Sequence, residues 1–346
     1  MRQAQLWRSA GIAVHLIISK AAFDKFERED AMPQSLLPKM LRYAEVVARA
    51  GSVQAAARVL NLSASAIDRQ ILLLEDLLGA PLFERQPDGM RLSAAGELVV
   101  TLAKRWQHDA SRLLTDIRQL QGINQGSLRL AAMDSHANGL MPVFLERLHR
   151  EHPRIRLEID IVSPDQAEAA LIAGTTDLAI AFNLKAGRDL HLVMQAELPL
   201  GCVVAPGHPL AGQPDTSLKA VSGYPIVSQN RSLTIRRYLE SRHGWLFAER
   251  EAPVQTNSLQ LVKHLAAAGS HVALTSELDA APEILAGRLC FIPLTDRNVQ
   301  PQTVAIAISA RRPLPRIGRL VADLLAEELR GCLEAVRQRR AAGSGG

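Results

Sequence analysis

Three patterns of hydrophobic and polar positions follow one another along the chain, and each predicts a different kind of structure. Residues 36–92 carry short apolar repeats at helical spacing, followed by a turn-rich piece. Residues 93–122 carry one long helical pattern, and from residue 123 short apolar strands alternate with helical segments. Such alternation is typical of β-α-β units. The sequence therefore predicts a multidomain chain with a small helical domain, a linker helix and an α/β domain.

The α/β region shows its pattern most clearly over residues 155–182. The segment "IRLEIDI" alternates with a period of two, which predicts a strand with one buried face. A helical pattern over residues 167–173 closes at Gly174, and residues 177–182 predict the next strand. We expect further strands in "GCVVAP", "YPIVSQ", "HVALTS" and "TVAIAIS", in a mostly parallel sheet. Because the last of these strands returns after a self-contained section, we expect two lobes: lobe I over about 127–199 and 302–340, and lobe II over about 200–300.

The segment "SVQAAARVLNLSASAIDRQI" (residues 52–71) predicts two short helices joined by a tight turn. Ser52 and Ser63 are suitable N-caps for the two helices. The second helix has one apolar face, made of Ile67, Ile71, Leu74 and Leu78. Its opposite, exposed face carries Ser65, Asp68 and Arg69. This arrangement fits a DNA-reading helix-turn-helix, and it also fits a generic pair of packed helices.

The flanking residues favour the first interpretation. Residues 41–100 read "LRYAEVVARAGSVQAAARVLNLSASAIDRQILLLEDLLGAPLFERQPDGMRLSAAGELVV". The elements "AGS", "AAARVL", "RQI", "PLFER" and "AG" stand at the spacing of LysR-type transcriptional regulators, which this chain resembles. The resemblance implies an all-α winged helix-turn-helix domain (36–92), a linker and dimerisation helix (93–122) and a two-lobed effector-binding domain (123–340). It further implies sequence-specific DNA binding controlled by a small molecule in the cleft of the α/β domain.

The start of the second helix departs from the family pattern, which usually has Gln, Pro and Ser where this chain has Ala64, Ser65 and Asp68. Ala64 cannot contact adenine through an amide, so the family's target sequence cannot be carried over. Asp68 would repel phosphates, but its carboxylate can accept a hydrogen bond from a cytosine amine in the major groove. The alternative is that Asp68 is paired within the protein.

Cations near the predicted wing complete the candidate DNA-binding surface. Arg85 and Arg91 flank "QPDG", a turn that predicts a wing tip between two short strands. On such a wing Arg91 would lie against the DNA backbone or minor groove and add affinity with little sequence information. Arg69 would contact a phosphate or a base edge, or it is an ordinary surface charge. The candidate DNA-binding residues are Ser63, Ser65, Asp68, Arg69, Arg85 and Arg91.

The long helical pattern predicts a helix that needs a partner. Ser93 is a suitable N-cap, and an apolar stripe follows at three-to-four spacing: Val99, Leu102, Trp106, Leu113, Ile117 and Leu120. A helix of about 28 residues spans roughly 40 Å, more than a small domain can bury. The simplest partner is the same helix of another subunit, although packing within one chain would also cover the stripe. A homodimer would present two recognition helices to a pseudo-palindromic site, and the resemblance implies a homotetramer.

The candidate effector site follows from the strand ends. Ligands of open α/β sheets bind outside the carboxyl ends of strands, where small hydroxyl and amide side chains suit a hydrogen-bonded pocket. The candidate effector-binding residues are Ser135, His136, Asn183, Ser228 and Asn257. Ordinary turn and helix-cap chemistry explains the same residues almost as well.

Neither catalysis, a cofactor nor a metal site is expected. The sequence has no G-x-S-x-G, P-loop or G-x-G-x-x-G motif. His149 and His152 lack a third ligand at useful spacing. The cysteines Cys202, Cys290 and Cys332 show no metal-ligand spacing, so we interpret them as small buried hydrophobes in a reducing compartment.

The termini and the net charge change this picture little. The formal charge of +5 indicates a polyanionic partner weakly, because many arginines lie between residues 311 and 340, where we expect a solvated surface. The run "GIAVHLIIS" resembles a signal sequence but lacks a cleavage site, so residues 1–35 are expected to be a disordered extension or a misassigned start.

We therefore expect a cytoplasmic regulator that binds double-stranded promoter DNA and a small-molecule effector, with RNA polymerase as a candidate partner and no membrane contact. A periplasmic-type solute-binding protein is the alternative. It would leave the helices after Ser52 without a role.

Overall fold

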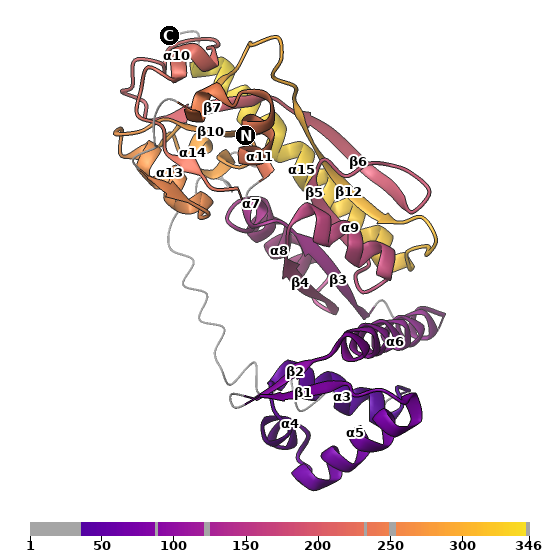
Figure 1. The fold of residues 1–346 in the computed structure, drawn as a ribbon. Coiled ribbons are helices and arrows are strands. Elements are labelled where there is room, and N and C mark those ends of the chain that lie inside the picture. The colour runs from indigo at the N-terminus through magenta and orange to yellow at the C-terminus, as the bar shows by residue number, and fades with distance from the viewer. Residues whose placement is uncertain (1–35, 87–88, 121–124, 232–233, 249–253, 344–346) are drawn as a thin grey trace. The chain divides into compact units, whose positions relative to one another are not determined.

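The computed structural model describes residues 36–86, 89–120, 125–231, 234–248 and 254–343. These residues divide into two compact units, the first ending near residue 127 and the second beginning at Leu128 (Figure 1). The extension expected over residues 1–35 lies outside the described residues. Within the described ranges, no helix has the length and apolar character needed to cross a bilayer.

The first unit is a bundle of three short helices with a two-stranded wing and one long helix. Its elements are α3 (Lys39–Ala50), α4 (Val53–Leu60), α5 (Ala64–Leu78), β1 (Phe83–Gln86), β2 (Gly89–Leu92) and α6 (Ala94–Leu120). Ser52 accepts a hydrogen bond from Ala55 N at 3.1 Å, and Ser63 accepts one from Ala66 N at 3.3 Å. Both predicted caps are therefore confirmed.

The core of this unit lies between α3, α4 and α5. Ile67, Ile71 and Leu74 of α5 are at most 4% exposed, as their spacing predicts. Leu78 was expected on the same face, but it is 48% exposed. It is the last residue of α5, after which Gly79 leaves the helix with a φ of 65°.

Residues of the segment that resembles the LysR-type regulators (41–100) fix the start of the wing on this core. The Glu75 carboxylate accepts hydrogen bonds from the backbone N–H of Leu82 at 2.6 Å and of Phe83 at 3.3 Å. A Cβ at Gly96 would collide with the carbonyl oxygen of Leu82, so a glycine is required there. β1 and β2 then pair antiparallel, with Gln86 opposite Gly89, which confirms the predicted wing strands.

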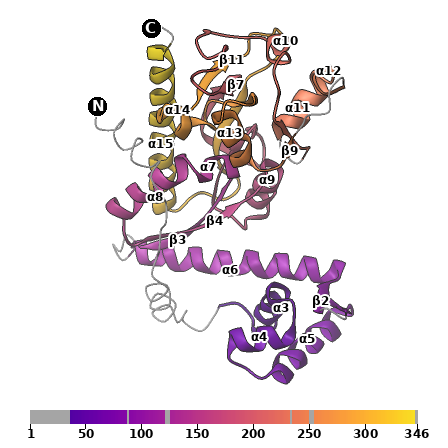
Figure 2. The ribbon, with the colours of Figure 1, turned by 90° about the vertical axis from the view of Figure 1, so that its left-hand side faces the viewer.

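α6 is one uninterrupted helix of 27 residues that packs against α3 (Figure 2). Ser93 accepts a hydrogen bond from Gly96 N at 3.0 Å, as expected for its N-cap. Most of the predicted apolar stripe is uncovered in the single chain: Leu102, Trp106, Leu113, Ile117 and Leu120 are between 42% and 88% exposed. Val99, at the start of the stripe, is partly buried against the helical core.

The described part of the second unit contains three sheets, of five, three and two strands. The five-stranded sheet has the order β4-β3-β5-β12-β6 and belongs to lobe I. Its strands are β3 (Gly126–Ala132), β4 (Ile155–Ile161), β5 (Leu178–Phe182), β6 (Leu190–Leu198) and β12 (Gln302–Ser309). β3 runs parallel to β5, whereas β12 runs antiparallel to both β5 and β6.

Lobe II is built between β6 and β12. Its strands are β7 (Leu200–Val204), β8 (Ser228–Gln229), β9 (Gln255–Thr256), β10 (Ala273–Ser276) and β11 (Cys290–Pro293). β10 and β11 both pair antiparallel with β7, and β8 pairs parallel with β9. The expectation of a mostly parallel sheet is therefore wrong, because the chain reverses when it leaves and re-enters lobe I. The strand expected in "YPIVSQ" is short: β8 takes up its last two residues, and Ile226 forms a single bridge with Val272.

Nine helices cover these sheets in the described part of the second unit. They are α7 (Asp134–Ala137), α8 (Leu140–Glu151), α9 (Pro164–Ala173), α10 (Leu218–Val221), α11 (Thr234–Arg242), α12 (Trp245–Ala248), α13 (Leu259–Ala267), α14 (Ala281–Leu285) and α15 (Arg316–Gly343). α15 lies along the sheet that contains β12 and β6 (Figure 1). Side chains from α15 and from both lobes form one continuous apolar core.

Most arginines between residues 311 and 340 are exposed, as expected of a solvated surface, although the apolar face of α15 packs into this core and two of its arginines form ion pairs. Arg337 Nε lies 2.8 Å from Glu277 Oε1, and Arg340 Nη1 lies 3.3 Å from Glu277 Oε2. Glu277 is fully buried. Arg337 also donates to the Glu197 carbonyl oxygen at 2.9 Å, so α15 connects residues of both lobes.

Two smaller expectations have different outcomes. Cys202 and Cys332 are buried free thiols, and burial raises the pKa of each to about 12, which confirms their interpretation as small hydrophobes. Cys290 is half-buried. The strand predicted over residues 155–161 forms as β4, but its apolar face is only partly buried: β4 lies at the edge of its sheet, and Ile161 is 49% exposed.

Candidate DNA-binding and effector-binding sites

The start of α5 presents a small polar surface. Ser63, Ser65 and Arg69 are exposed, and the two serine hydroxyls lie 3.3 Å apart. Asp68 is half-buried and takes part in an interaction within the chain. The apolar residues on the opposite side of α5 hold this surface outward.

The wing adds one described cation. Arg91 is exposed on β2 and stands directly opposite Glu84 of β1. Because opposite charges on facing positions attract, Glu84 offsets part of the positive charge of the wing. The side chain of Arg85 and residues 87–88 at the wing tip lie outside the described residues.

A cavity of about 250 Å³ lies in the second unit and draws its walls from both lobes. Its lining residues are Met133, Asp134, Ser135, Ile161, Val162, Ser163, Pro164, Gln166, Phe182, Gln229, Ile235, Leu259, Asp279 and Gln302. The walls therefore combine the ends of β3 and β4 in lobe I with α11, α13 and the segment after β10 in lobe II. Of the five predicted effector residues, Ser135 lines this cavity.

His136 lies next to it in the protein interior. It is 1% exposed, and its ring meets the edge of Phe182, a lining residue, with 5.4 Å between ring centroids. Neither ring nitrogen has a hydrogen-bond partner among the described residues. Burial lowers the pKa of His136 to about 3, so the imidazole is neutral at physiological pH.

Asn183 and Asn257 are not among the described lining residues. Asn183 adopts a φ of 58°, and its Oδ1 accepts a hydrogen bond from Thr303 N at 3.0 Å. It thereby joins the end of β5 to the start of β12. Asn257 is exposed, and the side chain of Ser228 lies outside the described residues, although its neighbour Gln229 lines the cavity.

The sequence pattern missed two buried polar residues of the cavity, Asp279 and Gln302. Asp279 is 5% exposed, and its Oδ2 accepts hydrogen bonds from Thr275 Oγ1 at 2.7 Å and Ser276 N at 3.3 Å. Burial raises the pKa of Asp279. Gln302 opens β12 and is 4% exposed. The available signal was the polar run "TSELD" after β10 and a glutamine at the entry of an otherwise apolar strand.

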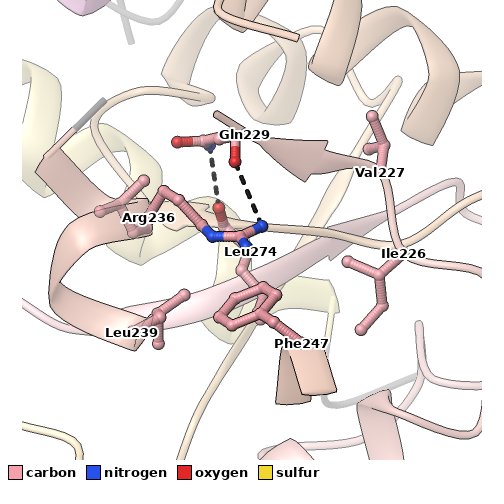
Figure 3. Close-up of a pocket in the computed structure, with 8 residues that line it drawn as sticks. Ile226, Val227, Gln229, Arg236, Leu239, Phe247 and Leu274 are labelled. Carbon is pink, nitrogen blue, oxygen red and sulfur yellow. Dashed lines mark hydrogen bonds between the residues drawn. The ribbon is translucent and has the colours of Figure 1, made fainter. Parts of the chain in front are cut away.

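A second, smaller pocket lies beside the cavity and shares Gln229 and Ile235 with it. Figure 3 shows the Arg236 guanidinium over the Phe247 ring, with 3.7 Å from its carbon to the ring centroid. Gln229 Nε2 donates to the Leu274 carbonyl oxygen at 3.2 Å, which fixes the amide between the two spaces. At about 20 Å³ this pocket has room for little more than one water molecule, so the larger cavity is the candidate effector site.

Within the described ranges, no three His, Cys, Asp or Glu side chains cluster as metal ligands. The structure therefore offers two candidate sites, one on the exposed start of α5 with the wing and one in the cavity.

Comparison with known proteins connects both sites to one family. Residues 38–97 match the bacterial regulatory helix-turn-helix proteins of the lysR family, and residues 121–330 match the LysR substrate binding domain. A probable nitrogen assimilation transcriptional activator of Synechococcus elongatus is 31% identical over 241 residues, covering 68% of this chain and 77% of the relative. An SDS degradation transcriptional activation protein of a Pseudomonas species is 28% identical over 301 residues, covering 85% and 94%.

Solved structures share the fold. Full-length OxyR from Pseudomonas aeruginosa superposes with a TM-score of 0.59 at 22% identity, covering 83% of this chain and 93% of that chain. CbnR in complex with its target DNA superposes with a TM-score of 0.58 at 20% identity, covering 87% and 99%. The two sequence relatives are named as transcriptional activators, and both matched domains are domains of DNA-binding regulators and not of enzymes.

Proposed function

Because the chain belongs to the LysR family of transcriptional regulators, we propose that it binds its promoter as a homo-oligomer and responds to a small molecule in the cavity. The DNA-binding domain and the effector domain are those of the family, so the protein is a DNA-binding regulator with an effector-binding domain. The oligomer, the DNA-contacting residues and the effector-binding residues are the proposed parts. Its work on promoter DNA would take place in the cytoplasm.

The observation that carries the proposal is the exposed stripe of α6. Five apolar side chains, from Leu102 to Leu120, are uncovered in the single chain. Such a stripe is stable in water when another copy of the helix covers it. A dimer through α6 would present two copies of α5 to one duplex, and two dimers would form the expected homotetramer.

We propose that the exposed start of α5 enters the major groove. Ser63 and Ser65 would donate to phosphates or base edges, Arg69 would contact a phosphate or a guanine, and Asp68 would accept from a cytosine amine. Arg91, and Arg85 with it, would lie along the DNA backbone from the wing. RNA polymerase is a candidate second partner, since two relatives are named as transcriptional activators.

Control by the effector requires the ligand to prefer one arrangement of the oligomer. A ligand with equal affinity for both arrangements would shift neither. Ser135 would contact the ligand directly, whereas His136 would support the cavity wall through Phe182. For Asn183 and Asn257, we propose that an effector role would depend on a rearrangement that brings the lobes closer together.

The test uses fluorescence anisotropy to measure binding of the full-length protein to duplex DNA taken from beside its own gene. We expect affinity to fall steeply between about 50 and about 200 mM salt, because phosphate contacts release counterions. A shuffled duplex of the same length and composition is the control and should bind far more weakly. Equal binding of both duplexes, or no binding at low salt, would contradict the proposal.

A further inference from the structure

We propose that the cavity recognises a small organic amine in its ammonium form, and not an organic acid. This inference rests on the proposed function, because it names the chemical class of the molecule that the effector domain senses. It depends on the charges around the cavity, on three oxygens without hydrogen-bond partners among the described residues, and on the capped amino terminus of α9.

The described lining residues include two carboxylates and no Lys, Arg or His. Asp134 is exposed, and Asp279 is buried. A carboxylate ligand would therefore meet the exposed charge of Asp134, the buried carboxyl of Asp279 and no cation on the described walls of the cavity. Because burial raises the pKa of Asp279, its carboxylate form is costly in the cavity, and a ligand cation beside it would offset that cost.

Cations near the cavity are engaged elsewhere. Lys263 Nζ lies 3.0 Å from Glu283 Oε2 and also donates to the backbone oxygen of Asp279. Arg236 stacks on Phe247 in the smaller pocket. Arg237 lies 3.8 Å from Asp165, and neither of these two residues lines the cavity. An anionic ligand would have to draw one of these cations away from its partner.

Three buried oxygens of lining residues have no hydrogen-bond partner in the described part of the chain: Ser135 Oγ, Asp279 Oδ1 and Gln302 Oε1. A buried acceptor without a partner costs free energy that a ligand donor would recover. An ammonium group carries three donors and no acceptor, which matches this set. The Asp279 carboxylate is already oriented through Oδ2 by Thr275 and Ser276.

A helix amino terminus usually favours an anion, but the amino terminus of α9 has few donors left. Pro164 has no N–H. Ser163 Oγ accepts from Gln166 N at 3.3 Å, and Gln166 Oε1 accepts from Ser163 N at 3.0 Å, so the two residues cap each other. The amino terminus of α9 therefore has few free N–H donors with which to bind an anionic ligand.

The remaining wall selects an amine with an apolar body. Ile161, Phe182, Ile235 and Leu259 contribute apolar surface on several sides of the cavity. The cavity, at about 250 Å³, is smaller than the range of roughly 300–1,000 Å³ that holds drug-sized ligands. A compact molecule with one ammonium group and one aliphatic or aromatic group fits both the polarity and the size.

The test compares ligands that share a carbon skeleton. Full-length protein is titrated by calorimetry with benzylamine, benzyl alcohol and benzoate, and then with a panel of other primary amines and their matching carboxylic acids. We expect amines to bind at least tenfold more tightly than the acids of the same skeleton. Acids that bind as tightly as their amines, or a panel in which no amine binds, would overturn the inference.

Two variants test whether the amine binds at Asp279 and Gln302. Asp279→Asn should weaken binding of the best amine at least tenfold and leave the matching alcohol unchanged. Asp160→Asn, the same substitution on an exposed residue of β4 beside Ile161, is the control and should bind the amine like the wild type. Because Asp279 also holds Thr275 and Ser276, Gln302→Leu is a second variant and should weaken the amine as well. Wild-type amine affinity in either folded variant would overturn the inference.

A second measurement on the same protein distinguishes failure of this inference from failure of the proposed function. Promoter binding is measured beside each titration. If acids bind in place of amines while promoter specificity is intact, the ligand class is wrong and the regulator stands. If promoter specificity is absent, the proposed function fails whatever the cavity binds.

Discussion

Asp68 places a carboxylate on the helix that we propose enters the major groove. Its half-buried position and its interaction within the chain are compatible with base reading and with internal pairing. The two roles differ in what they do to sequence preference. If Asp68 reads a base, its loss changes the preference at one base pair. If Asp68 pairs within the protein, its loss changes the shape of α5 and therefore lowers the affinity for all duplexes alike.

We therefore expect Asp68→Ala to reduce discrimination between the preferred and single-base-substituted promoters, by a factor corresponding to about 1–3 kcal/mol at one position. Affinity for shuffled DNA should change little, or rise as a negative charge is removed. Arg69→Ala is the comparison: a phosphate contact would weaken all duplexes and reduce the salt slope by about 1. Anisotropy across a set of duplexes measures both. Uniform weakening by Asp68→Ala would favour internal pairing.

His136 predicts a dependence of stability on pH. Its pKa in the folded chain is about 3, below the ordinary value of 6.5. Below that ordinary value the unfolded chain binds a proton that the folded chain rejects, so stability falls as the pH falls. The loss approaches about 1.4 kcal/mol per pH unit until the folded pKa is reached. Above pH 6.5 the residue adds no pH dependence, because it is neutral in both states.

Replacing this side chain should remove the effect. His136→Leu is expected to show a shallower decline of unfolding free energy between pH 6.5 and about 4.5, measured by denaturant titration at each pH. His149→Leu, at an exposed position of α8, serves as the control and should keep the wild-type slope. Parallel slopes for His136→Leu and the wild type would show that His136 is not the source.

At the residue scale, the sequence predicted local chemistry well. Ser52, Ser63 and Ser93 cap helices because each bonds to a backbone N–H a few residues away. Ser135 was found because it follows a strand. Asp279 and Gln302 were missed because their place on the cavity depends on how lobe II meets lobe I, which no local pattern encodes.

At the scale of elements, α6 shows where pattern and structure agree. The stripe spacing predicted an apolar face, and the structure leaves most of that face uncovered in one chain. α15 shows what a charge count leaves out. Most of its arginines are exposed, as expected, but the apolar residues between them pack into the shared core, and Arg337 and Arg340 pair with buried Glu277. The number of arginines did not predict this ion pairing, because Glu277 is distant in sequence.

The exposed face of α6 supplies a prediction about assembly. Leu113→Lys with Ile117→Lys should lower the oligomeric state, because four charges, two from each helix, would be buried in each helix pair. Sedimentation velocity measures the state. Promoter affinity should fall with it, since the two recognition helices would no longer act together. Thr101→Lys, on an exposed part of α6 away from the stripe, is the matched control and should remain assembled. Unchanged sedimentation of the double variant would contradict a dimer through α6.

At the scale of the whole molecule, the proposed function requires the cavity and the DNA-binding domain to be coupled. Ile161 lines the cavity and is 49% exposed, and Ile172 on α9 has the same exposure but does not line it. This pair allows a test in which the same substitution is made inside and outside the cavity.

Ile161→Trp should fill the cavity and abolish the response of promoter binding to the effector, while promoter affinity without effector is kept. Ile172→Trp should respond like the wild type. Anisotropy with and without the best ligand from the amine panel measures the response. A wild-type response in Ile161→Trp would show that the effector acts from another place.

Leu198 of β6 pairs with Gln302 of β12. The chain leaves lobe I after Leu198 and re-enters it at Gln302. Lobe II is thus an insertion whose two ends meet at one rung of the β-ladder, and in principle a hairpin turn could close the gap it would leave. Because Gln302 belongs to both this strand pair and the cavity wall, a molecule bound in the cavity would lie beside the place where the two lobes are joined.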